Sequence, residues 1–237
     1  GSGSALAASS SQLQAGTTLF NASYRSGDWS GSLAAWALDP TTGELTNRRW
    51  EASVPSHTGR SIYTAKTAPN GSITSVLFSQ ESDLDADMRS ALVNAFPGGT
   101  ASAQDLIDYL RGDQSKEVSA SGPFRNRASG VLGDIVHTTP VLVGAPDASR
   151  YRYTDWPEAD SYASVASTHS SRSDMVYVSA NDGMLHGFLA DNASSNKGLE
   201  MFAYMPRAAI MNGLANLADP DYQHRYFVDG PLVAQDV

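Results

Sequence analysis

The stretch that most constrains the fold is residues 174–190, Asp-Met-Val-Tyr-Val-Ser-Ala-Asn-Asp-Gly-Met-Leu-His-Gly-Phe-Leu-Ala. Two apolar runs, residues 175–178 and 184–190, flank the tripeptide Asn-Asp-Gly at residues 181–183. These three residue types tolerate positive φ at little steric cost, which a tight turn between right-twisted strands requires. The pattern therefore predicts a β-hairpin.

Two further segments complete a four-stranded unit around this hairpin. Residues 199–204 form a third strand-like run after a polar turn, and residues 133–144 form a fourth before the hairpin. Pro140 in the fourth run lacks a backbone N–H, which indicates a bulge or an unpaired edge position. Four short antiparallel strands joined by glycine-marked turns are typical of one blade of a β-propeller.

A second copy of this pattern indicates a second blade. Residues 31–39 and residues 183–191 both place Gly, Leu, an aromatic residue and Asp in the same order at the same spacing. The matched positions are Gly31, Leu33, Trp36 and Asp39 in one copy, and Gly183, Leu185, Phe188 and Asp191 in the other. Because a blade cannot bury its apolar face alone, repeated copies are what a propeller requires.

Other strand-like runs surround the first copy. A turn signal, Pro69-Asn70-Gly71, separates two of them and predicts another hairpin. The runs cover residues 17–24, 29–38, 45–52, 61–65 and 73–78.

The remaining segments divide the chain as follows. Residues 1–16 are rich in Ser, Ala and Gly and are predicted to be a flexible linker or a cloning-vector remnant, so the propeller part is residues 17–237. Apolar residues at helical spacing predict a helical insertion at about 83–113. A long polar loop is expected at about 145–173, and a short helix at 206–218.

The length of the chain limits how much of a propeller it can hold. Four-stranded blades use about 40–45 residues each, and closure usually needs four to eight of them. After the insertions are subtracted, the 237 residues leave room for two or three blades. We therefore expect the N-terminal part of a propeller domain from a longer protein, with residues 226–237 as the opening of another strand.

Composition excludes several classes of function. The chain has no cysteine, which excludes thiol catalysis and thiolate metal sites. Its formal net charge of −9 opposes phosphate backbones, so nucleic acid is not an expected partner. No apolar run approaches the length of a transmembrane segment.

Three long motifs carry a resemblance to a known family: Leu-Gly-Asp-Ile-Val-His-Thr-Thr-Pro-Val-Leu-Val-Gly at 132–144, Val-Tyr-Val-Ser-Ala-Asn-Asp-Gly-Met-Leu-His-Gly-Phe at 176–188, and Tyr-Gln-His-Arg-Tyr-Phe-Val-Asp-Gly at 222–230. With Tyr-Leu-Arg-Gly-Asp at 109–113 and Asp-Trp-Ser-Gly at 28–31, they resemble the PilC/PilY family of type IV pilus tip-associated adhesins. The resemblance covers about residues 17–237. It implies an all-β fold: a partial quinoprotein-like β-propeller, about two to three blades of a seven-bladed parent, with short helical insertions.

The resemblance also implies a function and a location. The family acts in type IV pilus biogenesis, in the balance of pilus assembly and retraction, in twitching motility and in attachment to surfaces or host cells. The expected location is extracellular, at the pilus tip or the outer-membrane-associated cell surface, with minor pilins as partners and host integrin as a candidate receptor. The family is not known for enzymes. Two alternatives stay open: a quinoprotein-type dehydrogenase, and a scaffold that binds minor pilins without adhesion.

The tripeptide Arg111-Gly112-Asp113 is the candidate receptor-binding site. A guanidinium and a carboxylate on a glycine-containing loop can engage the acidic, metal-containing face of an integrin, and the resemblance implies such use in some members. The alternative is that Gly112 caps a helix ending at Leu110, while Arg111 and Asp113 are ordinary surface charges.

Asp83, Asp85 and Asp87 are the weak metal candidates, because their alternation matches the start of a calcium loop. Such a loop requires Gly at its sixth position and Glu at its twelfth, where this chain has Met88 and Asn94. The alternative is that the carboxylates cap a helix N-terminus. No cofactor is predicted in this segment, and the resemblance implies calcium only for the parent protein.

The histidines and large aromatic residues are expected to be structural. None of the histidines has metal-ligand spacing, and three lie inside the motifs, where buried hydrogen bonds within turns and strands are the expected role: His137, His186 and His224. Four aromatic residues are expected to fill gaps between sheets: Trp29, Trp36, Trp50 and Phe188.

Overall fold

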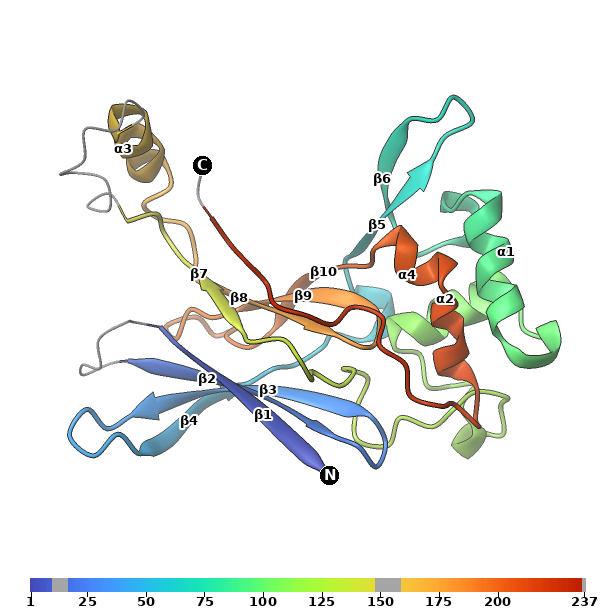
Figure 1. The fold of residues 1–237 in the computed structure, drawn as a ribbon, viewed down its shortest axis with the longest axis horizontal. Coiled ribbons are helices and arrows are strands. Elements are labelled where there is room, and N and C mark those ends of the chain that lie inside the picture. Colours follow the sequence, from blue (N-terminus) through green and yellow to red (C-terminus); the bar gives the residue numbers. More distant parts are fainter. Residues whose placement is uncertain (10–16, 148–158, 236–237) are drawn as a thin grey trace.

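The computed structural model describes residues 1–9, 17–147 and 159–235, and it contains two β-sheets and a group of helices (Figure 1). The first sheet has four strands in the order β1-β2-β3-β4, all antiparallel. Its strands are β1 (Ser2–Ala8), β2 (Thr18–Arg25), β3 (Ser30–Leu38) and β4 (Leu45–Glu51). The predicted strands of the first copy are therefore confirmed.

Strand β1 was not predicted, and the linker expected over residues 1–16 is wrong for residues 2–8. Those residues pair with β2 from Ser2 opposite Arg25 to Ala8 opposite Leu19. β1 is an edge strand of small residues that contributes backbone hydrogen bonds rather than apolar side chains, so it has no hydrophobic alternation to detect. Residues 10–16 lie outside the described residues.

The second sheet has six strands in the order β6-β5-β10-β9-β8-β7. Its four strands β7 to β10 are antiparallel neighbours, which confirms the predicted blade. The fourth predicted strand is much shorter than residues 133–144, because only the three residues after Pro140 pair with β8 at the sheet edge. The strands are β5 (Ile62–Thr67), β6 (Ile73–Leu77), β7 (Val141–Val143), β8 (Met175–Ala180), β9 (Met184–Leu189) and β10 (Glu200–Tyr204).

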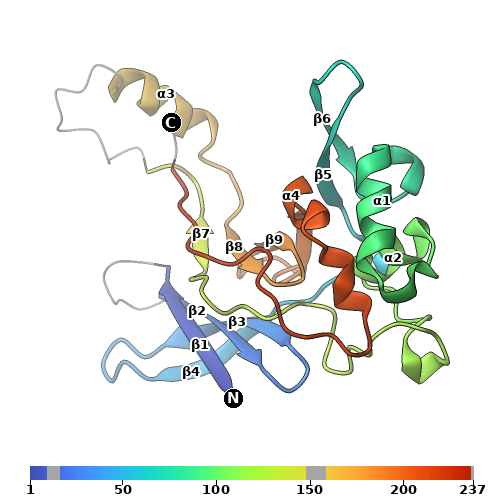
Figure 2. The ribbon, with the colours of Figure 1, turned by 45° about the vertical axis from the view of Figure 1, so that its right-hand side comes forward.

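The hairpin of β5 and β6 extends this blade in a way the sequence did not indicate. β5 runs parallel to β10, with Ala203 opposite Ile62 and Tyr204 opposite Tyr63. The hairpin itself was predicted, but its attachment joins segments that are about 140 residues apart in the sequence, as Arg60 and Glu200 are. In Figures 1 and 2 the far end of the hairpin projects beyond the rest of the sheet.

Three of the helices, α1, α2 and α4, gather beside the β5–β10 end of the sheet, whereas α3 lies apart from them, beyond β7 (Figure 1). The predicted helical insertion and the short helix near residue 206 are both confirmed. The predicted loop at 145–173 is wrong in part, because it contains a helix, α3, which packs Tyr162 and Ala166 inward; residues 148–158, with Tyr151, Tyr153 and Trp156, lie outside the described residues. The helices are α1 (Ala86–Ala95), α2 (Ala103–Arg111), α3 (Ala159–Thr168) and α4 (Arg207–Met211).

Two apolar cores hold these parts together. Between the sheets, Phe20, Leu33 and Trp50 pack against Val178 and Phe188 from the blade. Each such side chain contributes about 1.5–3 kcal/mol when fully buried, so this contact is a main source of cohesion between the sheets. The expectation that Trp50 and Phe188 fill the gap between sheets is confirmed.

The second core lies between the six-stranded sheet and the helices. Tyr109 and Phe124 meet at a ring-centroid distance of 5.2 Å, with Leu106, Ile107 and Ile210 also fully buried. This core joins α1, α2 and α4 to the inner face of β5 and β10. In the described part of the chain, no helix is long and apolar enough to cross a membrane.

Candidate functional site

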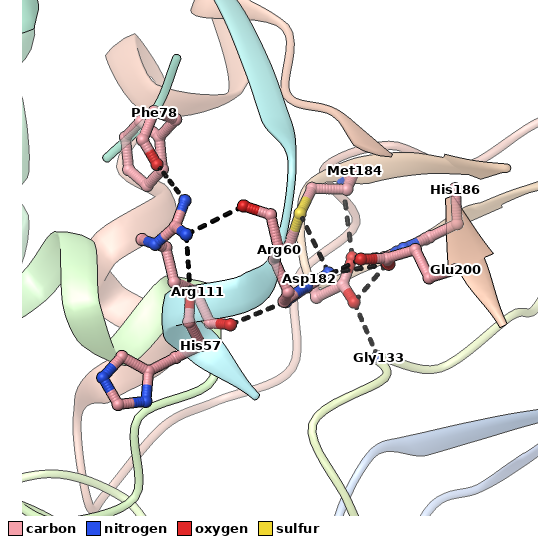
Figure 3. Close-up of polar contacts among 9 residues, drawn as sticks. All are labelled: His57, Arg60, Phe78, Arg111, Gly133, Asp182, Met184, His186 and Glu200. Atoms are coloured by element: carbon pink, nitrogen blue, oxygen red, sulfur yellow. Dashed lines mark hydrogen bonds and ion pairs between the residues drawn. The ribbon is translucent and has the colours of Figure 1, made fainter. Parts of the chain in front are cut away.

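The structure places the predicted receptor tripeptide at the end of α2, with its arginine inside the protein. Arg111 is 4% exposed, and its guanidinium donates hydrogen bonds to the backbone carbonyls of Phe78, His57 and Arg60 at 2.7, 2.6 and 2.9 Å (Figure 3). Burial lowers the pKa of Arg111, and the charge of Arg60 lowers it further. The prediction that Arg111 is a surface charge is therefore wrong.

The other two residues of the tripeptide shape the end of the helix. Gly112 has φ of 114° and is the C-cap of α2 as predicted, although the helix ends at Arg111 rather than at Leu110. The carboxylate of Asp113 accepts hydrogen bonds from the backbone N–H and hydroxyl of Ser115 at 2.9 and 2.8 Å, and these bonds lower its pKa although partial burial alone would raise it. Integrin contact by all three residues stays a prediction, and it requires Arg111 to leave its three carbonyl partners.

The three alternating aspartates lie at the start of α1. Asp85 is the N-cap of α1, accepting from the Met88 N–H at 2.9 Å, and its carboxylate also contacts Arg207 at 3.2 Å. Asp83 lies in the short turn before the helix, and Asp87 lies in its first turn with an 81% exposed side chain. The capping alternative is confirmed. Within the described ranges, no cluster of three His, Cys, Asp or Glu side chains could hold a metal ion. Calcium in the parent protein stays a prediction.

A buried network of charges lies where the blade meets the helices (Figure 3). His186 on β9 is fully buried between two carboxylates, with Nδ1 2.7 Å from Glu200 and Nε2 3.0 Å from Asp182. Glu200 on β10 also accepts two hydrogen bonds of 2.8 Å from the guanidinium of Arg60. Glu200 thus joins β9 to the segment that leads into β5.

Positive and negative charges among Arg60, His186, Asp182 and Glu200 are equal in number only when His186 is protonated. Burial alone would lower the pKa of His186, but the carboxylates of Asp182 and Glu200 raise it to about 9. Burial alone would raise the pKa of Glu200, but hydrogen bonds and charge from His186 and Arg60 lower it to about 2. At neutral pH the two cations face two carboxylates, and both imidazole nitrogens donate.

Reciprocal contacts extend the network into α2. Arg60 donates to the carbonyl of Arg111 at 2.9 Å, while Arg111 donates to the carbonyl of Arg60 at 2.9 Å. The backbone N–H of Gly133 donates to Asp182 at 2.9 Å on the other side. Gly133 must be glycine for this approach, because a Cβ there would lie 2.4 Å from the Asp182 nitrogen. Blade, helical insertion and the segment before β7 therefore converge on one point.

A second cluster of polar side chains binds the segment that follows α4 to the blade. Asp134 accepts from Asn181 and contacts His224 Nε2, both at 2.8 Å, and Trp29 stacks on His224 with ring centroids 3.6 Å apart. Burial raises the pKa of Asp134 despite these two partners. Trp29 therefore does not fill the gap between sheets as predicted. All three motif histidines are hydrogen-bonded, but His137, whose Nδ1 is 2.5 Å from Asp229, has a 63% exposed side chain and is not buried as expected.

The ion pairs and hydrogen bonds of this arrangement hold separate segments of the chain together. Each ionisable side chain of the central network faces a partner of opposite charge or a backbone carbonyl, and His186, Arg60 and Glu200 are buried. The sequence alone could not identify Arg60 or Glu200 as members, because neither lies in a motif and their partners are distant in the chain. Asp182 and Asp134 lie inside the motifs, and their placement in turns beside motif histidines was the available signal.

A polar groove opens beside this junction, with a volume of about 520 Å³. Its walls come from β2, β3 and the end of β4 on one side and from the end of α2 on the other. Arg25, Glu51, His57, Gly112 and Gln114 are among the residues that line it.

Fold and site together define a propeller-type β-sheet protein whose buried charges join a blade to a helical insertion. The family model described as the PilY1 beta-propeller domain matches residues 132–237. A type IV pilus biogenesis factor PilY1 homolog of Xylella fastidiosa is 39% identical over the whole chain, and a second such homolog from that organism is 32% identical over 88% of it. The type IV pilus biogenesis factor PilY1 of Pseudomonas aeruginosa strain UCBPP-PA14 is 29% identical over 93% of the chain.

The chain belongs to the PilC/PilY family, as these matches show. It spans only 16% to 19% of the length of these three relatives. No solved structure matches the chain. The presence of a β-propeller domain is thus shown, while the described residues form two sheets and no closed ring.

Proposed function

We propose that this chain is a structural segment of a type IV pilus biogenesis factor, acting at the cell surface or pilus tip. The observation that carries the proposal is that ionisable residues of the motifs, among them Asp182, His186 and Arg111, are hydrogen-bonded or ion-paired inside the junction rather than exposed. Such residues maintain a rigid blade, and a rigid blade suits a protein that works by holding partners rather than by catalysis.

The expected partners are minor pilins or other components of the pilus tip. The relatives are named as pilus biogenesis factors, which supports a role in assembly. The finer roles that we propose are support of the balance between assembly and retraction, twitching motility and attachment to surfaces. A non-adhesive scaffold for minor pilins is the simpler form of the same proposal.

The test is a chromosomal deletion of residues 131–237 from the full-length gene, with surface piliation, twitching and attachment measured in the same strain. Loss of surface pili, with the shortened protein still made and exported, is the expected result. Normal piliation with lost attachment would replace the assembly role by a purely adhesive one, and no change in any readout would contradict the proposal.

A point variant tests the role in pilus assembly without removing the domain. Glu200→Gln removes one charge from the buried network, while Glu51→Gln removes one from an exposed pair with Arg48. We expect fewer surface pili only for the first. The alternative of a quinoprotein dehydrogenase would instead be supported by the absorbance of bound quinone in the purified full-length protein.

A further inference from the structure

The polar groove beside the junction has the size of a small-molecule site. Its volume of about 520 Å³ lies within the range of about 300–1,000 Å³ that is typical of ligand pockets. Four parts of the chain line it: the β2–β3 hairpin, the segment 51–57, the residues after α2 and the segment 129–132. No side chain of the buried charge network belongs to the lining, so the cohesion of the junction does not account for the groove.

Backbone contacts hold the walls of the groove in place. On one wall, the N–H of Gly31 on β3 donates to the carbonyl of Leu132 at 2.9 Å, and the carbonyl of Gly133 leaves no room for a Cβ on Gly31. On the other wall, the carbonyl of His57 accepts from Arg111 at 2.6 Å. The groove is therefore formed before a ligand arrives, and a ligand does not have to order it.

Hydroxyl groups dominate the lining. Ser23 on β2 and Ser32 on β3 lie side by side and share a hydrogen bond of 2.8 Å between their oxygens. A serine hydroxyl offers one donor and two acceptor lone pairs, so it matches a ligand whose own hydroxyls both donate and accept. The serines of the lining are Ser23, Ser30, Ser32, Ser56 and Ser129.

The charges of the lining are balanced. Among the described residues that line the groove, Arg25 is the only arginine or lysine and Glu51 the only carboxylate. Glu51 opposes a phosphate or another anion, which would also lack a cluster of guanidinium groups to bind it. One carboxylate is too few for a divalent cation, which prefers six or more oxygen ligands. The lining thus suits a polar ligand without net charge.

Two rings complete the lining. The ring of Tyr24 packs over the backbone of Gly3, where a Cβ would lie 2.6 Å from the Tyr24 Cε1 atom. The imidazole of His57 points away from the buried network (Figure 3). An aromatic face buries C–H groups, while a phenol hydroxyl or an imidazole nitrogen reaches a polar group beside them. A sugar ring presents both kinds of surface.

We propose that this groove binds a short, uncharged oligosaccharide. The guanidinium of Arg25 donates to sugar hydroxyls, the carboxylate of Glu51 accepts from them, and the serine hydroxyls do both. The ring of Tyr24 contacts the C–H face of a sugar unit. This binding site is separate from the role in pilus assembly, because its side chains are not those that hold the blade to the helical insertion.

The test is the binding of maltotriose, cellotriose and chitotriose to the purified full-length protein, measured by isothermal titration calorimetry. Ser56→Trp fills the groove from one wall. Thr58→Trp is the matched control, because Thr58 is exposed two residues further along and does not line the groove. We expect at least one of the three sugars to bind, with a Kd that rises at least about tenfold in Ser56→Trp and is unchanged in Thr58→Trp.

A second variant keeps the test valid if the tryptophan disturbs folding. Arg25→Ala, on the β2–β3 wall, removes a charged donor and should also raise the Kd about tenfold. Failure of all three sugars to bind, or equal affinity in Ser56→Trp and Thr58→Trp, would overturn the proposal. Tighter binding of trigalacturonate would identify an anion site, and tighter binding of triglycine a peptide site; either result would also overturn it.

Discussion

The sheet β1–β4 and the blade β7–β10 share one plan but differ in the chemistry at one equivalent position. Ala34 on β3 corresponds to His186 on β9, three residues after the glycine that starts each repeat. On the neighbouring strands, Arg48 lies opposite Trp36 and Glu200 lies opposite Phe188. The first sheet thus has a small residue and an exposed charge where the blade has a buried ion pair.

This difference shows which kind of interaction each of the two contacts of the blade requires. The first sheet packs on the blade mainly through apolar side chains, because two twisted faces fit each other over a large area. The blade meets the helical insertion through backbone carbonyls and chain ends, which have to be hydrogen-bonded when buried. Arg60 and Arg111 provide those donors, and Glu200 and Asp182 supply negative charge to a group that also contains His186.

Removing one charge from the buried network should have the largest effect on the free energy of unfolding. Glu200→Gln leaves Arg60 and His186 facing each other without a full counter-charge, and breaking such a buried pair costs about 3–5 kcal/mol. The free energy of unfolding, measured by urea titration, should fall by that amount. The control Glu51→Gln, in a pair whose side chains are about half exposed, should cost at most about 1 kcal/mol. Equal losses in the two variants would remove the distinction between buried and exposed pairs.

The same network predicts a pH dependence. The pKa of His186 is raised from 6.5 to about 9 in the folded state, so its contribution is complete below about pH 6.5 and is lost as pH rises through about 9. The pKa of Glu200 is lowered from 4.5 to about 2, so its contribution is present above about pH 4.5 and is lost as pH falls through about 2.

The measurement compares wild type with His186→Gln across the alkaline range. Their difference in free energy of unfolding should shrink by up to about 3 kcal/mol between pH 6.5 and 9.5, given 1.36 kcal/mol per pKa unit. A difference that stays constant over this range would contradict a charged His186.

The close approach at Gly133 should have a smaller effect. Gly133→Ala places a methyl group against the Asp182 backbone and should cost about 2 kcal/mol, within the usual range for steric changes at buried sites. Gly27→Ala is the matched control, because a Cβ there meets no atom within 4 Å. If both variants melt at the same temperature, the convergence of segments on Asp182 is looser than the structure shows.

The helix cap should have the smallest effect. Asp85→Ala removes the N-cap of α1 and should cost about 1 kcal/mol, with no dependence on added calcium or chelator. Asp87→Ala should be nearly neutral because its side chain is exposed. A melting temperature that rises with calcium in wild type but not in Asp85→Ala would favour the metal-site reading instead.

Local patterns in the sequence predicted most of the strands and helices, since alternation, helical spacing and turn residues report on each element separately. Strand β1 was missed because its small residues form no hydrophobic pattern. The parallel pairing of β5 with β10 was missed because nothing in either strand encodes a neighbour that lies far away in the chain.

The candidate site shows the same limit. Arg111 was taken for an exposed charge because Arg-Gly-Asp reads as a loop, whereas the fold turns its side chain toward three carbonyls. Arg60 and Glu200 carried no signal at all, because a buried ion pair is defined by two distant segments. The hydrogen-bonded role of the motif histidines could be predicted, but only the partner Asp182 lies near its histidine in the sequence, since Asp229 and Asp134 are 92 and 90 residues from His137 and His224.

The most direct test is a double-mutant cycle on Arg60 and Glu200, because the central claim is that their pairing holds the blade to the segment before β5, from which Arg60 also reaches α2. Arg60→Gln, Glu200→Gln and the double variant would be compared by urea unfolding. We predict a coupling energy of at least about 2 kcal/mol, near the upper part of the range for contacting residues. A coupling below about 0.5 kcal/mol would contradict the claim.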